Sequence, residues 1–247
     1  MQEKQPQLRC DDQRGSSPSD PLAAYRQMRR EQPQLFRNPK GPVGTEIVYD
    51  ARALRLAEQG GVDRMKQLGV PESWARLGLL YQNEFFSVLR DPVRFSPGRY
   101  GIYIRVVMNP AMTPGSVVLP LYRSQVVMVE QFRHATRDLH LELPRGFGSP
   151  RLTPEETACQ EVQEEIEGRV VRLESLGMMH TNTGVTDEQS ALFFAELDEI
   201  GSVQEEEGIV RLRLFDVEEV ERLIADGTIT DAFTLCAMYR ARLRKLL

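Results

Sequence analysis

The chain has 247 residues, of which 41% are hydrophobic and 27% are charged, and its formal net charge is −5 at pH 7. This composition is typical of a globular protein, and the mild negative charge argues against general nucleic-acid binding, which requires a basic surface. No run of about 18 apolar residues predicts a transmembrane helix. The three cysteines are spread too widely for a metal motif or a disulfide framework, so we expect a cytoplasmic protein with reduced thiols.

The N-terminal part of the chain predicts a mixture of helices and strands. Residues 1–20 are polar and lack the apolar core of a signal peptide, so we expect a disordered tail. A helix is expected to begin at Pro21. The segment 51–69 predicts one helix, or two helical pieces broken at Gly60 and Gly61. Short strands are expected at 45–50, on both sides of a bend within 77–95, and at 97–108.

Further along, the pattern is rich in strands. The runs 116–122 and 125–133 predict a hairpin. Thr153 is a good helix cap, Pro154 suits the first helical position, and Glu156 completes a capping box, so a helix is expected to begin here. The other expected elements are a strand from residue 140, strands at 170–180, 189–197 and 211–215, a helix up to residue 227, and a closing helix at 229–247. This order predicts an α+β fold.

Four glutamates lie within seven residues of the helix that follows Thr153. Glu161, Glu164 and Glu165 are spaced so that their carboxylates come near one point beside the helix. Mg²⁺ binds through such oxygens, whereas a solvated acidic face is the simpler alternative. The apolar stripe that we expect to pack on a sheet consists of Ala158, Val162 and Ile166. Spacing alone leaves both interpretations of the glutamates open.

The segment LPRGFGSPRLTPEETACQEVQEEIEG, residues 143–168, resembles the Nudix box. That pattern is Gly, five residues, Glu, seven residues, then Arg-Glu-apolar-x-Glu-Glu-x-Gly. The flanking segments 131–146 and 180–197 are similar to the ADP-ribose pyrophosphatase branch of the family, and the likeness covers roughly residues 100 to 240. The box positions that match are Gly146, Glu161, Val162, Glu164 and Glu165.

The resemblance implies a particular architecture. The expected fold is α+β, with a Nudix-type α/β/α sandwich around a mixed sheet and an N-terminal α/β extension. The divisions we expect are the tail at 1–20, the extension at 21–95 and the Nudix domain at 96–247. In the ADP-ribose branch the N-terminal region often pairs two subunits, so the resemblance implies a homodimer. We expect neither nucleic acid nor membrane as a partner.

The resemblance also implies a metal-dependent hydrolase. Mg²⁺ or Mn²⁺ would be held by Glu161, Glu164, Glu165 and the backbone carbonyl of Arg145. The substrate class is a nucleoside diphosphate linked to another moiety, with ADP-ribose or a nucleotide sugar as the first guess. Glu188 matches the loop glutamate that serves as the general base in some ADP-ribose pyrophosphatases, and Glu164 is the second choice for this role. An exposed loop acid is the alternative interpretation of Glu188.

The substrate-binding candidates lie just before the helix. Arg133 and Arg145 are candidates for binding phosphate or ribose, because a guanidinium group matches phosphate oxygens. Arg133 follows a predicted strand and is the better candidate. Glu142 is expected either to hydrogen-bond an adenine or ribose group or to pair with an arginine. Gly146, the leading glycine of the box, is placed with these residues.

Three box positions depart from the pattern. Leu152 replaces the early glutamate, Gln160 replaces the arginine, and Glu167 replaces the final glycine, with Gly168 one residue late. In the family the arginine is understood to steady the helical carboxylates. The branch also usually shows a proline downstream of the box, yet the last proline here is Pro154. The changes at positions 152 and 160 keep an alternative open, namely a catalytically degraded Nudix domain that acts as a nucleotide-binding sensor or interaction module.

Overall fold

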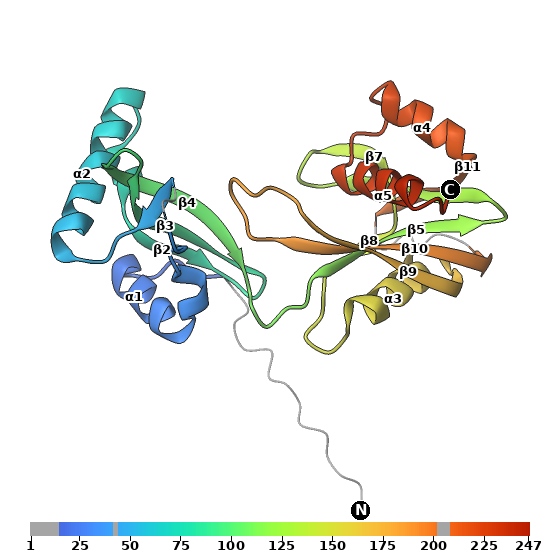
Figure 1. Ribbon diagram of the computed structural model, residues 1–247, viewed down its shortest axis with the longest axis horizontal. Coiled ribbons are helices and arrows are strands. Elements are labelled where there is room, and N and C mark those ends of the chain that lie inside the picture. Colours follow the sequence, from blue (N-terminus) through green and yellow to red (C-terminus); the bar gives the residue numbers. More distant parts are fainter. Residues whose placement is uncertain (1–14, 42–43, 202–207) are drawn as a thin grey trace, which may run out of the picture. The chain divides into compact units, whose positions relative to one another are not determined.

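The computed structural model describes residues 15–41, 44–201 and 208–247, which divide into two compact units (Figure 1). Unit 1 contains the described residues up to Asn109 together with Gly184–Asp187, and unit 2 contains Pro110–Thr183 and Glu188–Leu247. Most of the predicted disordered tail falls outside the described residues. In the part of the chain that is described, no helix is long and apolar enough to cross a membrane.

Unit 1 is built on a four-stranded antiparallel sheet. β3 lies at its centre, and β4 pairs with one edge of β3 along its full length, while β1 and β2 share the other edge. A core that includes Tyr25, Phe36 and Leu89 joins the first helix to the sheet. The elements are α1 (Pro21–Glu31), η1 (Pro33–Phe36), β1 (Thr45–Ile47), α2 (Ala51–Leu68), η2 (Glu72–Ala75), β2 (Gly78–Gln82), β3 (Phe86–Phe95) and β4 (Arg99–Met108).

Helix α2 runs without a break through Gly60 and Gly61, so the two-piece alternative is wrong. Both glycines lie where the helix closely approaches β4. A Cβ atom at Gly60 would lie 2.3 Å from the carbonyl oxygen of Tyr100, and one at Gly61 would lie 2.9 Å from Cγ2 of Ile102. The helix ends at Leu68 and is capped by Gly69, whose φ of 68° is the left-handed conformation favoured at helix ends. The two internal glycines therefore allow close packing rather than interrupt the helix.

Unit 2 is built on a mixed sheet of seven strands within the described residues. The order is β11–β6–β5–β10–β9, with β7 beside β6 and β8 beside β5; β5 and β10 are parallel, and the other pairs are antiparallel. The elements are β5 (Gly115–Tyr122), β6 (Gln125–Arg133), β7 (Asp138–Glu142), β8 (Arg145–Gly146), α3 (Pro154–Ile166), β9 (Arg169–His180), β10 (Gln189–Glu199), β11 (Ile209–Phe215), α4 (Val217–Ala225) and α5 (Ala232–Leu243). The predicted mixed sheet is confirmed.

Helices cover both faces of this sheet, with α3 on one side and α4 and α5 on the other (Figure 1). Successive side chains of a strand point to opposite faces. Val117 and Leu119 therefore pack in the cluster of α4 and α5, while Val118 packs in the cluster of α3. The buried residues of α3 in that cluster are the predicted stripe Ala158, Val162 and Ile166. These three layers form the expected α/β/α sandwich.

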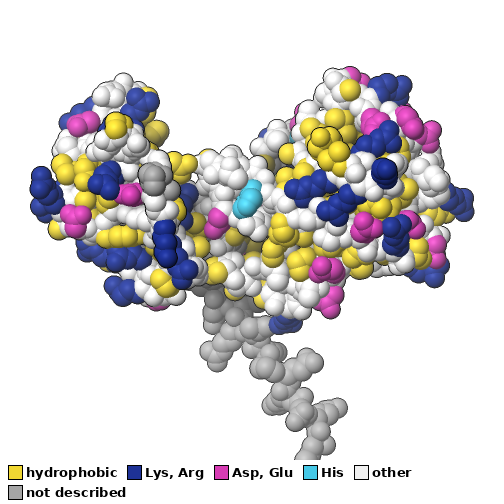
Figure 2. Space-filling model, viewed as in Figure 1, with side chains coloured by type: hydrophobic (Ala, Val, Ile, Leu, Met, Phe, Trp, Pro, Cys, Tyr) yellow, Lys and Arg dark blue, Asp and Glu magenta, His cyan; other side chains and the backbone are white. Residues whose placement is uncertain are grey.

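The surface of unit 2 carries charges of both signs. On the face shown in Figure 2, acidic and basic side chains are interspersed over this unit. Ion pairs also join neighbouring strands of this unit: Arg172 with Glu196, and Arg211 with Glu130. Exposed pairs of this kind add little stability and mainly keep opposite charges close to one another.

Candidate functional site

The start of α3 has the geometry that its sequence predicts. The Oγ1 atom of Thr153 accepts a hydrogen bond from the backbone N–H of Glu156 at 3.2 Å. In return, Oε2 of Glu156 accepts from the backbone N–H of Thr153 at 2.8 Å. These bonds lower the pKa of the Glu156 carboxyl, and Pro154 occupies the first helical position. The predicted capping box is confirmed, and it sets the residue at which the helical phase of the glutamates begins.

Glu161 points at the strand that precedes the helix. A Cβ atom at Gly146 would lie 1.8 Å from Oε1 of Glu161, so the carboxylate rests directly against this glycine. No larger residue fits at position 146 while Glu161 keeps this position. The leading glycine of the box thus makes room for the first helical carboxylate, where β8 and α3 meet.

Glu165 is buried at the same junction. Its side chain is only 3% exposed, and its Oε2 atom accepts a hydrogen bond from the backbone N–H of Arg145 at 3.1 Å. The pKa of Glu165 is raised to about 8, mainly by burial and secondly by the negative charge of Glu161. Two carboxylates that repel each other where water is scarce are a donor set that a divalent cation suits. The metal-ligand role of the Arg145 carbonyl stays a prediction.

Glu164 is placed differently. It is exposed, and its Oε1 atom accepts a hydrogen bond from Nε2 of Gln160 at 2.7 Å. Within the described ranges, no three His, Cys, Asp or Glu side chains are arranged as a metal-binding group. The structure thus brings Glu161 and Glu165 to one junction, and it leaves Glu164 on the outer surface of the helix beside the residue that replaces the box arginine.

A buried glutamate lies between both arginine candidates. Glu142 is 1% exposed; its Oε1 accepts from Nε of Arg133 at 2.6 Å and its Oε2 accepts from Nη2 of Arg145 at 2.9 Å. Burial raises the pKa of Glu142, and the arginines oppose this shift without cancelling it. Glu142 pairs with arginine, as one of its two expected roles requires. Its contact with a substrate stays a prediction.

The two arginines differ in how their side chains are used. Nη1 of Arg145 lies 3.2 Å from Oδ1 of Asp231, and its guanidinium carbon lies 4.4 Å from the ring centre of Phe233. Asp231 also caps α5, because its Oδ2 accepts from the backbone N–H of Thr234 at 2.9 Å. Arg145 is therefore held by two acids and a ring, whereas the side chain of Arg133 is 30% exposed and can still meet a ligand.

Sequence reasoning missed Asp231 and Phe233. The only local signal was an aspartate followed three residues later by Thr234, which marks a helix cap. Nothing in the local pattern links this cap to Arg145. The closing helix accordingly begins at Ala232, later than expected, and ends at Leu243.

Glu188 lies at the end of the loop between β9 and β10. The hydroxyl of Thr181 donates a hydrogen bond to its Oε2 atom at 2.7 Å. Glu188 is half-buried rather than fully exposed, so it is not simply a solvated loop acid. Its role as the general base stays a prediction.

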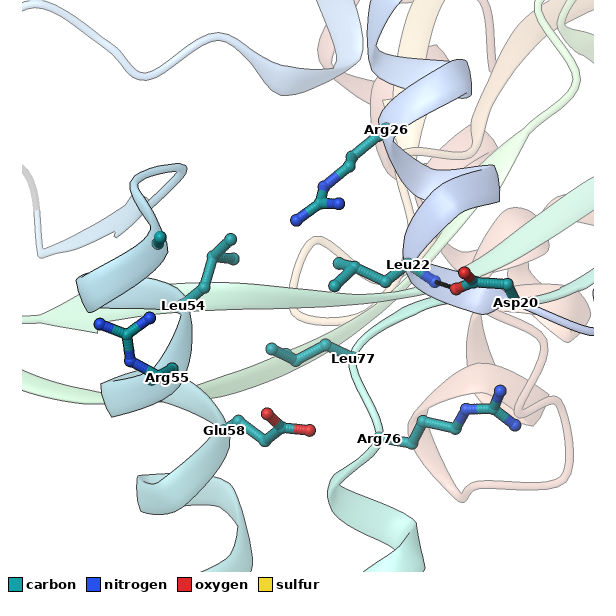
Figure 3. Close-up of a pocket in the computed structure, with 9 residues that line it drawn as sticks. Asp20, Leu22, Arg26, Leu54, Arg55, Glu58, Arg76 and Leu77 are labelled. Carbon is teal, nitrogen blue, oxygen red and sulfur yellow. Dashed lines mark hydrogen bonds between the residues drawn. The ribbon is translucent and has the colours of Figure 1, made fainter.

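Unit 1 has a cavity of about 330 Å³ between α1 and α2 (Figure 3). Arg26 points over its apolar side chains, but the guanidinium group of Arg76 turns away and donates to the carbonyl of Ser19 at 3.0 Å. Asp20 is used to cap α1, where it accepts from the backbone N–H of Leu22 at 3.1 Å. The lining residues therefore do not converge on one ligand charge. They are Asp20, Leu22, Arg26, Ala51, Leu54, Arg55, Glu58, Arg76 and Leu77.

Residues 112–233 match the NUDIX domain family. The chain is 28% identical over 140 residues to the ADP-ribose pyrophosphatase of Bacillus subtilis (strain 168), an alignment that covers 54% of this chain and 75% of the relative. A crystal structure of an ADP compounds hydrolase has the same fold, with a TM-score of 0.57 and 18% identity over 68% of this chain and 90% of that chain. Residues 112–233 of this chain therefore form a Nudix domain.

Proposed function

We propose that this chain is a metal-dependent Nudix pyrophosphohydrolase that cleaves the diphosphate of a nucleoside diphosphate linked to another moiety. The observation that carries the proposal is the junction of β8 and α3, where Glu161 rests against Gly146 and the buried Glu165 lies beside it. The name of the Bacillus subtilis relative supports ADP-ribose as the first substrate to test, followed by nucleotide sugars.

Glu161 and Glu165 would hold Mg²⁺ or Mn²⁺, with Glu164 and the carbonyl of Arg145 as further ligands. Glu164 can join them because its side chain is exposed and is held only by its bond to Gln160 among the hydrogen bonds described. When bound, the ion would neutralise the diphosphate and lower the pKa of the attacking water. The positive charge would also favour the ionised form of Glu165 over its buried neutral form.

The remaining roles are those of the general base and of the substrate-binding residues. Glu188 would accept the proton of the attacking water, with its carboxylate oriented by Thr181, and Glu164 is the second choice for this role. Arg133, whose side chain is partly exposed, would bind a phosphate oxygen. Glu142 would keep Arg133 in place and offer an acceptor to the nucleoside.

A second candidate is a Nudix domain that binds a nucleotide without cleaving it. The observation on its side is that Gln160, in place of the box arginine, holds Glu164 on the outer surface of α3. In this interpretation Arg133 and Glu142 would serve binding alone. Substrate turnover separates the two candidates.

The test is hydrolysis of a substrate panel. The protein is incubated with Mg²⁺ or Mn²⁺ and ADP-ribose, nucleotide sugars, NADH or dinucleoside polyphosphates, and phosphate-containing products are followed. We expect turnover of at least one compound, and a loss of more than about 100-fold in Glu161→Gln and in Glu165→Gln, since even indirect support of a metal is worth about 10- to 100-fold. The control is Glu155→Gln, an exposed glutamate in the first turn of α3.

The outcomes are distinct. No turnover of any compound at high protein concentration would contradict the hydrolase and leave the binding module, which equilibrium binding of ADP-ribose then tests. Full turnover by the double variant would contradict the assignment of Glu161 and Glu165. A loss in the Glu155→Gln control would show that the assay reports the folding of α3 rather than its chemistry.

A further inference from the structure

Strand β4 has one edge that β3 does not use. Residues Gly184–Asp187, which belong to unit 1, pair with this edge. The backbone N–H of Val106 donates to the carbonyl of Val185 at 2.8 Å, and the backbone N–H of Asp187 donates to the carbonyl of Val106 at 3.3 Å. The resulting bridge between Val106 and Thr186 is parallel. A free strand edge, which otherwise leaves backbone groups unpaired, is thus partly covered by a loop segment.

Two further bonds flank this bridge. The hydroxyl of Tyr103 donates to the carbonyl of Gly184 at 2.6 Å. The backbone N–H of Met108 donates to Oδ1 of Asp187 at 2.8 Å. Both ends of the segment Gly184–Asp187 are therefore tied to β4, once through a side chain of the strand and once through a side chain of the loop.

These bonds do not serve to build a core. Val185 is the only aliphatic side chain of the segment, and it is 43% exposed. None of residues 184–187 belongs to the hydrophobic clusters of the described chain. The four hydrogen bonds consequently fix where the loop lies and bury little apolar surface.

The next residue after this segment is Glu188, followed by Gln189 at the start of β10. The backbone of Glu188 is therefore held on one side by the anchored Asp187 and on the other by the strand. We infer that β4 positions the loop that presents Glu188, and that Tyr103 and Asp187 are positioning residues for this general base. The inference rests on the proposed hydrolase function, and it assigns strand β4 a role in holding this loop.

The test removes each tie separately. Asp187→Ala deletes the acceptor for Met108, and Tyr103→Phe deletes the donor to Gly184. We expect faster hydrogen–deuterium exchange in peptides spanning 181–189 in both variants. We also expect kcat to fall about 10- to 100-fold with KM within about threefold, because a small misplacement of a reacting group costs rate rather than binding. Asp187→Asn keeps an acceptor oxygen and should restore both measurements.

Two variants serve as matched controls. Asp226→Ala removes a bond of the same kind, from the backbone N–H of Thr228 at 2.9 Å, outside this loop. Tyr122→Phe removes a hydroxyl group on β5 for which the described residues show no hydrogen bond. Both should keep wild-type kcat and wild-type exchange in the loop.

Each contrary result has its own meaning. Unchanged exchange in Asp187→Ala and Tyr103→Phe would overturn the anchoring, whatever the activity. Faster exchange with unchanged kcat would overturn the positioning role while leaving the proposed hydrolase intact. A loss in Asp187→Asn as large as in Asp187→Ala would show that the charge of Asp187 is needed rather than its hydrogen bond. Absence of turnover by the wild-type protein would contradict the proposed function itself, and the positioning role with it.

Discussion

Glu165 is the residue at which burial and charge oppose each other most directly. Its carboxyl group is almost fully enclosed and lies close enough to Glu161 for the two charges to repel. The N–H group of Arg145 offsets only part of this cost, and the net effect is a pKa of about 8. A buried carboxylate needs a compensating partner. In the metal-free protein this raised pKa favours the protonated form of Glu165 at neutral pH.

We expect Glu165→Gln to flatten the pH dependence of stability in the metal-free protein. The folded-state pKa lies above the ordinary value of 4.5, so between about 4.5 and 8 the folded protein keeps a proton that the unfolded chain releases. The free energy of unfolding therefore falls as pH rises through this window, with a limiting slope of about 1.4 kcal/mol per pH unit from this group. Urea unfolding in EDTA between about pH 5 and 8 measures it. Equal slopes in both proteins would contradict the raised pKa.

Glu167 shows the cost of a missing glycine. It ends α3 with φ 48° and ψ 35°, a left-handed conformation that strains any residue with a Cβ atom. This is the position where the Nudix pattern has its final glycine. We expect Glu167→Gly to raise the free energy of unfolding by about 0.5–1 kcal/mol in urea titrations. The gain is reduced by the stabilisation that the Glu167 side chain now draws from its contact with Gly201. Glu167→Ala is the control, since it removes the same side chain but keeps the strain. If Glu167→Ala stabilised the protein as much as Glu167→Gly, backbone strain would be excluded as the explanation.

In helix α2, helix propensity and close packing have opposite effects on a substitution at Gly60. Alanine in place of glycine inside a helix normally gains about 1 kcal/mol. At Gly60, however, the added Cβ would lie 2.3 Å from a backbone oxygen of β4, which cannot move without disturbing the sheet. We expect Gly60→Ala to lower the free energy of unfolding by about 1–3 kcal/mol, because overpacking outweighs propensity. Chemical denaturation measures this change. The control is Arg52→Ala on the exposed surface of α2, whose free energy of unfolding should lie within about 0.5 kcal/mol of the wild-type value. A more stable Gly60→Ala variant would show that helix and strand can separate.

The same elements show how far the sequence predicts the fold and the site. The start of α3 was predicted correctly because Thr153 and Glu156 cap one another over three residues, so the signal is local. The sequence alone could not decide whether α2 is continuous. A glycine pair predicts a break in a helix unless it is known that a strand packs closely against it. The partnership of Arg145 with Asp231 was missed because it depends on how distant segments pair. The family resemblance named Glu161 and Glu165, but their unequal burial came only from the structure.

At the scale of the whole molecule, the candidate site combines segments that lie far apart in the chain. Strands β6 to β8 supply Arg133, Glu142 and Gly146, helix α3 supplies the glutamates, and the start of α5 supplies Asp231. In the metal-free protein this assembly brings acidic groups together at a cost to stability. Any ligand that binds the folded chain and not the unfolded chain should therefore stabilise all of these segments together.

We accordingly expect Mg²⁺ or Mn²⁺ to raise the melting temperature of the wild-type protein. At a concentration of about 100 times Kd, mass action adds about 2.7 kcal/mol to the free energy of unfolding. The double variant Glu161→Gln/Glu165→Gln should lose this response, while Glu155→Gln on the exposed first turn of α3 should keep it. Thermal scans at matched ionic strength, with KCl in place of MgCl₂, separate specific binding from screening of surface charge. An equal rise in the double variant would place the cation elsewhere on the chain, and the burial of Glu165 would then serve structure alone.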